Sequence, residues 1–81
     1  MDMTELLKRY AAGERDFPEQ KLSGTDFRGI NLSRINLSRS IMWKTNLSNA
    51  SLIGANLALA SLACATIKVP GLQFAFDTLA Q

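Results

Sequence analysis

Residues 45–59 read TNLSN-ASLIG-ANLAL, three units of five residues with a leucine at the centre of each. The same spacing of large apolar residues continues in both directions, through Phe17, Leu22, Phe27, Leu32, Leu37, Met42, Leu47, Leu52, Leu57, Leu62, Ile67 and Leu72. Two places before most centres lies a second, mostly smaller residue, in the series Thr25, Ile30, Ile35, Ser40, Thr45, Ala50, Ala55, Ala60 and Ala65. A repeat at a fixed period indicates an architecture of stacked units.

Neither a regular helix nor a flat strand accounts for a period of five. Five residues rotate an α-helix by about 140°, which scatters the centres around its axis. On a strand, side chains alternate, so a step of five sends successive centres to opposite faces. A chain that turns a corner every five residues keeps all centres inside a coil. With four sides, residues twenty apart stack in the apolar columns Phe17/Leu37/Leu57, Leu22/Met42/Leu62, Phe27/Leu47/Ile67 and Leu32/Leu52/Leu72.

The remaining positions of each unit are expected to point outward. Short polar residues precede the centres, and Asp26/Asn46/Thr66 and Asn36/Asn56 would stack and bond to neighbouring backbone or to one another. Gly24, Gly29 and Gly54 end their units, where a turn needs the conformational freedom of glycine. The sequence therefore predicts an all-β solenoid.

Units such as ASLIG at 50–54 and ANLAL at 55–59 resemble the Ala-Asp/Asn-Leu-x-x motif of pentapeptide-repeat proteins. TDFRG at 25–29 and TNLSN at 45–49 fit equally well, and the regular run covers about residues 20–69. The resemblance implies the right-handed parallel quadrilateral β-helix of that family. Family members are commonly longer, so the chain is expected to be either a minimal member or a fragment.

We expect three segments along the chain. Residues 1–16 form an N-terminal capping helix and lead-in, residues 17–69 form the β-helix of about two and a half coils, and residues 70–81 form a C-terminal cap or interface. A cap is expected because the end coils of a solenoid expose an apolar cross-section.

A helix is predicted over residues 3–12. Asp2 lies three residues before Glu5, which is a helix start signal. The apolar face would consist of Leu6, Leu7, Tyr10 and Ala11. Besides capping, an amphipathic helix of this kind could bind a partner.

The C-terminal segment allows two structures. Leu72, Phe74 and Phe76 alternate as on a strand, whereas Leu72, Phe76 and Leu79 fit one face of a helix. Either form could cover the last coil or pair with a second copy, and the resemblance permits dimers joined at this end. Leu72, Phe74, Phe76 and Leu79 are therefore candidate interface residues in a homodimer.

Charge is unevenly distributed along the chain, whose net charge is +2. No acid lies between Phe27 and Phe76. The same stretch contains five cations, which are the candidate anion-binding residues: Arg28, Arg34, Arg39, Lys44 and Lys68. These cations either keep the protein in solution or bind nucleic acid or another anionic surface. Some pentapeptide-repeat proteins resemble duplex DNA through an acidic surface and bind DNA gyrase; the lack of acids disfavours that role.

Trp43 is a large aromatic residue expected to point outward, next to the outward-pointing Ile41. The two could form an apolar contact patch and make Trp43 a further candidate interface residue. Alternatively, a neighbouring segment or the N-terminal helix packs over them.

The composition disfavours catalysis. The chain has no histidine and a single cysteine, Cys64, interpreted as a small apolar residue, and its abundant serines have no base beside them. No cofactor or metal is expected. The N-terminus lacks the features of a signal peptide and no run approaches about 20 apolar residues, so a cytoplasmic location is expected. The prediction is a non-enzymatic structural or protein–protein interaction module.

Overall fold

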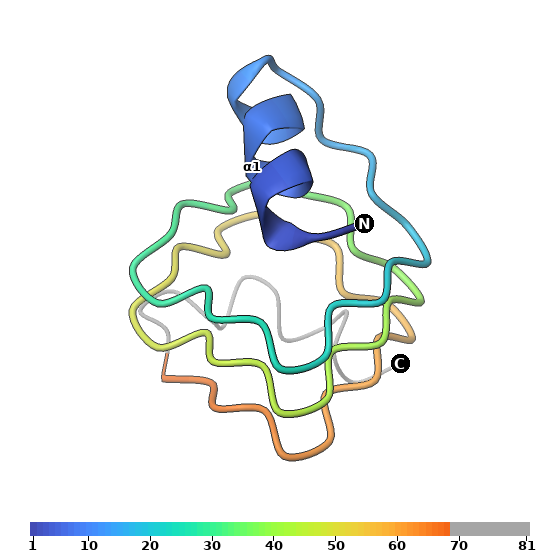
Figure 1. The fold of residues 1–81 in the computed structure, drawn as a ribbon, viewed down its shortest axis with the longest axis vertical. Coiled ribbons are helices and arrows are strands. Elements are labelled where there is room, and N and C mark those ends of the chain that lie inside the picture. The colour runs from blue at the N-terminus through green and yellow to red at the C-terminus, as the bar shows by residue number, and fades with distance from the viewer. Residues whose placement is uncertain (69–81) are drawn as a thin grey trace.

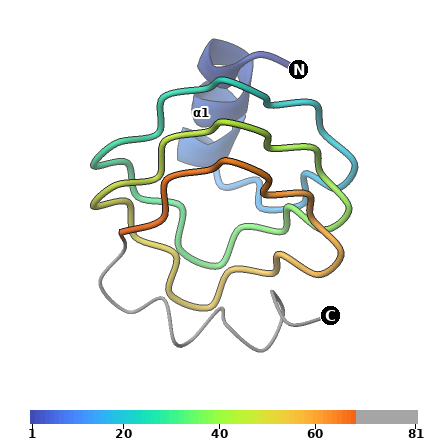
Figure 2. The same ribbon diagram turned by 90° about the horizontal axis from the view of Figure 1, so that it is seen from below.

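The computed structural model describes residues 1–68, which form one helix followed by a stack of coils (Figure 1). Helix α1 spans Met3–Ala11. Within the described residues the backbone pairs only through isolated parallel bridges, which join residues twenty apart: Asp16–Asn36, Lys21–Ile41, Asp26–Asn46, Asn31–Ser51, Asn36–Asn56, Ile41–Ser61 and Asn46–Thr66. Successive bridges start five residues apart, so four sides complete one coil (Figure 2). The expected four-sided coil is confirmed.

Three backbone hydrogen bonds of 2.7–3.0 Å join each bridged pair of sides. For the side centred on Leu22, the Leu22 N–H donates to the Ile41 carbonyl and the Gly24 N–H to the Trp43 carbonyl, while the Ile41 N–H donates back to the Gln20 carbonyl. The same pattern recurs on every bridged pair. Each coil is therefore fixed in register on its neighbours.

A tight turn ends each side. In nine of these turns the N–H of the residue three places after a centre donates to the carbonyl of that centre, at 3.0–3.4 Å. The third residue of the turn has a positive φ, as in a type II turn. Glycine fills this position at Gly24, Gly29 and Gly54, as the sequence predicts. Other residues adopt it at Glu19, Arg34, Arg39, Lys44, Asn49, Leu59 and Cys64.

The unit centres form the core. Those from Phe17 to Leu57 are buried, as are Ile35, Ala50 and Ala55 from the position two residues earlier. Two polar residues at that same earlier position are buried with partners: the Ser40 hydroxyl accepts from the Gln20 N–H at 3.1 Å, and the Thr45 hydroxyl donates to the Met42 carbonyl. The predicted inward centres are thus confirmed from Phe17 to Leu57, and the buried polar residues are satisfied internally. Of the other predicted inward positions, Thr25, Ile30, Ala60, Leu62, Ala65 and Ile67 are only partly buried, and Leu72 lies outside the described residues.

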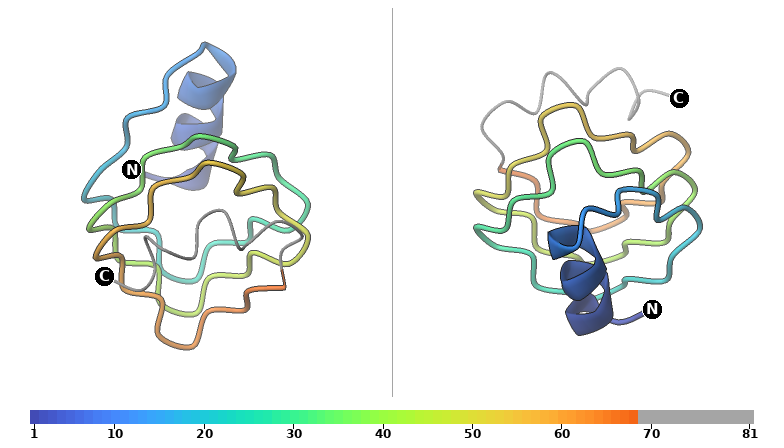
Figure 3. Two further views of the ribbon diagram at one scale, coloured as in Figure 1. Left: turned by 180° about the vertical axis from the view of Figure 1, so that it is seen from behind. Right: turned by 90° about the horizontal axis from the view of Figure 1, so that it is seen from above.

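The coils are numbered in chain order: the first contains residues 15–34, the second 35–54, and the third begins at residue 55. Helix α1 lies beside the first coil, at the end of the stack opposite the third coil (Figure 3). Its first turn is capped by the Asp2 side chain, which accepts from the Glu5 N–H at 2.9 Å. Leu6 is fully buried in the same core cluster as the unit centres, and Met3, Leu7 and Tyr10 pack partly against it. The tyrosine hydroxyl also donates to the Ser33 carbonyl of the first coil, at 2.9 Å.

Two details of the helix prediction are corrected. The helix ends at Ala11, and Ala12 is its C-cap. Ala11 is exposed and does not belong to the packed face, which consists of Met3, Leu6, Leu7 and Tyr10. Among the described residues, no helix is long and apolar enough to cross a membrane. The C-terminal segment 70–81, with Leu72, Phe74, Phe76 and Leu79, lies outside the described residues.

Candidate functional site

The outer surface consists of four sides, numbered here in chain order. The first side contains residues 15–19, 35–39 and 55–59, and the second contains 20–24, 40–44 and 60–64. The third contains 25–29, 45–49 and 65–68, and the fourth contains 30–34 and 50–54. The last residue of each five-residue unit lies at the corner that ends its side.

Short polar side chains before the unit centres bond to the local backbone. The Oδ1 atoms of Asp26, Asn31, Asn36, Asn46 and Asn56 each accept the N–H of the residue two places later, at 3.0 Å. Neighbouring coils are also joined, since the Asn36 amide donates to Asp16 at 2.7 Å. These Asx turns bear out the expectation that the polar columns satisfy nearby backbone, and they indicate that this N–H faces outward.

The five candidate anion-binding residues do not form one surface. Arg28 and Lys68 both lie on the third side, with Ser48 between them, as the spacing of twenty residues predicts. Arg34, Arg39 and Lys44 end three consecutive units, so they lie at three different corners. Their charges therefore point in different directions around the coil.

Arg28 is, in addition, paired with an acid. Its Nη2 lies 2.8 Å from Asp26 Oδ2, and its Nε lies 2.9 Å from Oδ1 of the same carboxylate. Hydrogen bonds from Arg28 hold the pKa of Asp26 below its ordinary value, and the carboxylate raises the pKa of Arg28. Both side chains are more than half exposed. The pair leaves Arg28 less able to bind an external anion.

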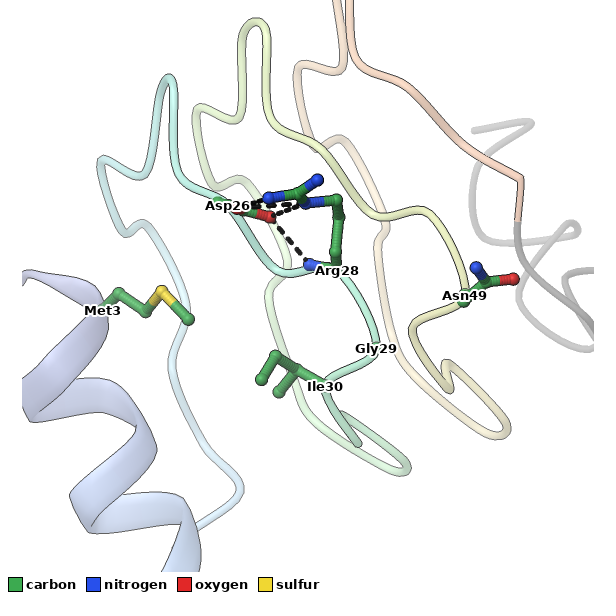
Figure 4. Close-up of a pocket in the computed structure, with 6 residues that line it drawn as sticks. All are labelled: Met3, Asp26, Arg28, Gly29, Ile30 and Asn49. Atoms are coloured by element: carbon green, nitrogen blue, oxygen red, sulfur yellow. Dashed lines mark hydrogen bonds and ion pairs between the residues drawn. The ribbon is translucent and has the colours of Figure 1, made fainter.

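An open hollow of about 570 Å³ adjoins this ion pair, between the start of α1 and the third side (Figure 4). It is lined by Met3, Asp26, Arg28, Gly29, Ile30 and Asn49. The arginine is turned toward the aspartate within it. The lining has no nucleophile next to a base, and the described residues contain no group of three or more His, Cys, Asp or Glu that could hold a metal ion.

The second side carries the aromatic candidate. Trp43 is 52% exposed, so neither α1 nor another described segment covers it completely. Ile41, two residues earlier, is half-buried on the same side. Lys44 ends the same unit, and Lys21 lies one coil earlier, bridged to Ile41. The sequence interpretation missed Lys21, although its distance of twenty residues from Ile41 places it on this side.

Two further large apolar residues are exposed outside the second side. Ile53 is 52% exposed on the fourth side, at the unit position that Trp43 occupies on the second. Leu59 is 59% exposed at the corner where the second side begins in the third coil. The spacing of five predicts that both positions point outward, but the sequence interpretation did not identify either residue as a candidate contact.

The fold and surface define a small β-helical repeat module. The family model for pentapeptide repeats matches eight copies, over residues 21–50 and 30–63, which together make up more than half of the chain. The chain therefore belongs to the pentapeptide-repeat family, whose fold is a right-handed quadrilateral β-helix.

Among solved structures, the chain is similar to HetL, a pentapeptide repeat protein involved in heterocyst differentiation regulation from the cyanobacterium Nostoc. The TM-score is 0.68 at 29% sequence identity, over 85% of this chain. The matched region is 32% of HetL, so the chain spans about a third of that protein. A comparison with curated protein sequences found no match.

Proposed function

We propose that the chain is a non-enzymatic pentapeptide-repeat module that acts by contact with another protein. The observation that carries this proposal is the exposure of three large apolar side chains, Trp43, Ile53 and Leu59, on a coil whose other outward positions are mostly small or polar. Each apolar side chain is about half exposed or more, and tryptophan is one of the residue types that most often anchor protein contacts. The backbone hydrogen bonds between coils hold them on a rigid support.

Within this proposal, α1 is the cap of the coil stack. Leu6 extends the core cluster at the first coil, and the Tyr10 hydroxyl donates to the Ser33 carbonyl at the free edge of that coil. A cap supports the contact role because it covers the apolar end of the first coil and leaves the sides available. Homodimerisation through residues 70–81 stays a prediction.

The alternative function is weak binding of nucleic acid or another anionic surface. Six cations in residues 17–68 favour it, but Arg34, Arg39 and Lys44 lie at separate corners and Arg28 is paired with Asp26. Phosphate binding gains from several cations on one surface. The scatter of the cations therefore counts against phosphate binding, whereas Trp43 and the corner residue Leu59 both adjoin the second side, in successive coils.

The test is capture of proteins from nuclease-treated cell extract on the immobilised full-length chain. The wild type should retain proteins that the triple variant Trp43→Ala, Ile53→Ala and Leu59→Ala does not. Ser48→Ala is the control, because it alters an outward polar position on the third side. Equal retention by wild type and triple variant, together with duplex-DNA binding that weakens steeply with salt, would support the alternative.

A further inference from the structure

The second side differs from the other three at one position of the repeat. The residue before the centre is Lys21, Ile41 or Ser61 on this side, whereas each other side has an aspartate or asparagine there in at least one coil. As a result, no side chain among the described residues accepts the N–H of Ser23, Trp43 or Ala63. On the other sides, the corresponding N–H groups of Arg28, Ser33, Ser38, Ser48 and Ala58 are donors of Asx turns, whereas that of Ile53, which follows Ser51, has no side-chain acceptor among the described residues.

These three N–H groups form a column of donors that faces solvent. Five of the equivalent N–H groups elsewhere bond to outward side-chain oxygens, and Ser23, Trp43 and Ala63 are themselves exposed. Successive donors are one coil apart, about 4.8 Å, so the column is about 9.6 Å long. That length corresponds to about three residues of an extended chain, so acids at two alternate positions, about 6.7 Å apart, fit within it. A carboxylate is the strongest common acceptor for such donors.

The charge of the second side favours the same kind of ligand. Its charged residues are Lys21 and Lys44, and its fifteen residues include no acid; the nearest acid along the chain is Glu19, at the preceding corner. Two copies of this side facing each other would bring lysines together. An acidic segment would instead place its carboxylates among the two lysines and the backbone donors.

Resting on the contact function proposed above, we propose that the second side binds an acidic, extended segment of a partner protein. Carboxylates of that segment accept the N–H groups of Ser23, Trp43 and Ala63, in place of the asparagine oxygens that accept them on the other sides. The Trp43 indole, which lies between the small residues Ser23 and Ala63 in its column, packs on the backbone of the segment. Lys21 and Lys44 provide the attraction for acids.

The probe is the labelled peptide Asp-Leu-Asp-Leu-Asp, titrated with the full-length protein and followed by fluorescence anisotropy. We expect saturable binding that weakens with salt, and at least tenfold weaker binding of Asn-Leu-Asn-Leu-Asn, which keeps the acceptors but lacks the charge. In the wild type, the amide proton of Trp43 should shift downfield on binding, since its N–H gains a charged acceptor.

The decisive variant is Ile41→Asn. It restores the residue type that forms the Asx turn elsewhere, so its own side chain accepts the Trp43 N–H. We expect peptide affinity to fall at least fivefold while the thermal melting temperature stays the same or rises. A variant that merely damaged the fold would lower both.

Matched controls separate this side from the rest of the surface. Trp43→Ala should weaken peptide binding about tenfold, while Ile53→Ala, at the same unit position on the fourth side, should leave it unchanged. The pair Lys21→Glu and Lys44→Glu should abolish binding. The double variant Arg34→Glu/Lys68→Glu changes the net charge by the same amount outside the second side, and it should retain most of the peptide binding.

Three results with the peptide would overturn the proposed site. The first is no saturable binding at about 1 mM peptide, and the second is equal affinity for the aspartate and asparagine peptides. The third is a peptide affinity of the second-side variants that stays within twofold of the wild-type affinity. Duplex DNA that competes with the peptide and binds more tightly would also overturn it, in favour of a phosphate ligand. If Ile41→Asn and the double variant Lys21→Glu/Lys44→Glu still retain the proteins captured from extract, the contact function stands and only this site is wrong.

Discussion

Leu47 provides the most direct test of the coil. Its side chain is fully buried in the second coil, between Phe27 and Ile67 of its column. Leu47→Ala should lower the free energy of unfolding by about 2.7–5 kcal/mol, the loss of buried methyl groups plus the cavity that remains. Leu47→Asp loses about 1.5–3 kcal/mol of apolar burial and adds several kcal/mol for a carboxyl group without a partner.

These losses are large compared with the stability of so small a protein. At about 0.05–0.15 kcal/mol per residue, 81 residues have a free energy of unfolding of about 4–12 kcal/mol. Leu47→Ala should therefore be weakened but measurable, whereas Leu47→Asp should be unfolded at 25 °C; Leu52→Asp should behave in the same way.

Urea titration followed by far-ultraviolet circular dichroism measures the difference, with exposed Arg34→Ala as the control expected to match the wild type. A Leu47→Asp protein with the midpoint of the wild type would refute the inward placement of the unit centres.

The remaining predictions concern the turns, the helix and the surface ion pair. Gly29 has a φ of +68°, so Gly29→Val should lower the free energy of unfolding by about 1–3 kcal/mol in urea titration. Leu59 has a φ of +62° and is exposed, so Leu59→Gly should raise it by about 0.5–1 kcal/mol; a decrease would contradict strain at this turn. Tyr10→Phe should cost about 1 kcal/mol and increase hydrogen exchange in the first coil, leaving the second coil protected. Arg28 lowers the pKa of Asp26 below its ordinary value of 3.8. The ion pair therefore stabilises the fold above pH 3.8, and this contribution to the free energy of unfolding is lost as the pH falls through the lower pKa of the folded state. In Asp26→Asn, urea titrations at a series of pH values should lack this part of the acid dependence.

The sequence was sufficient to predict the core because the repeat itself fixes which residues point inward. Once Leu47 and Leu52 are centres of successive sides, the inward position of Ala50 and the outward position of Trp43 follow without any three-dimensional information. The helix start was also predictable, since capping by Asp2 depends on residues within one turn.

Interactions between segments at no fixed spacing could not be predicted in this way. The bond from Tyr10 to Ser33 depends on how α1 lies on the first coil, which no repeat specifies. The pairing of Arg28 with Asp26 was local and could have been recognised, because the residues before and after a centre both point outward. The scatter of Arg34, Arg39 and Lys44 likewise follows from their shared place at the end of a unit.

The hydrogen bonds between coils have a consequence for the length of the molecule. Every bridged pair of sides uses the same three bonds, and no bond among those of the described coils spans more than one coil step. A coil therefore does not depend on how many others follow it, and a duplicated segment 37–56 would present the same inward columns and the same edges to its neighbours. Such a protein can be lengthened in increments of twenty residues, each adding about 4.8 Å, so that its size along the stack is set in discrete steps by gene duplication or by design.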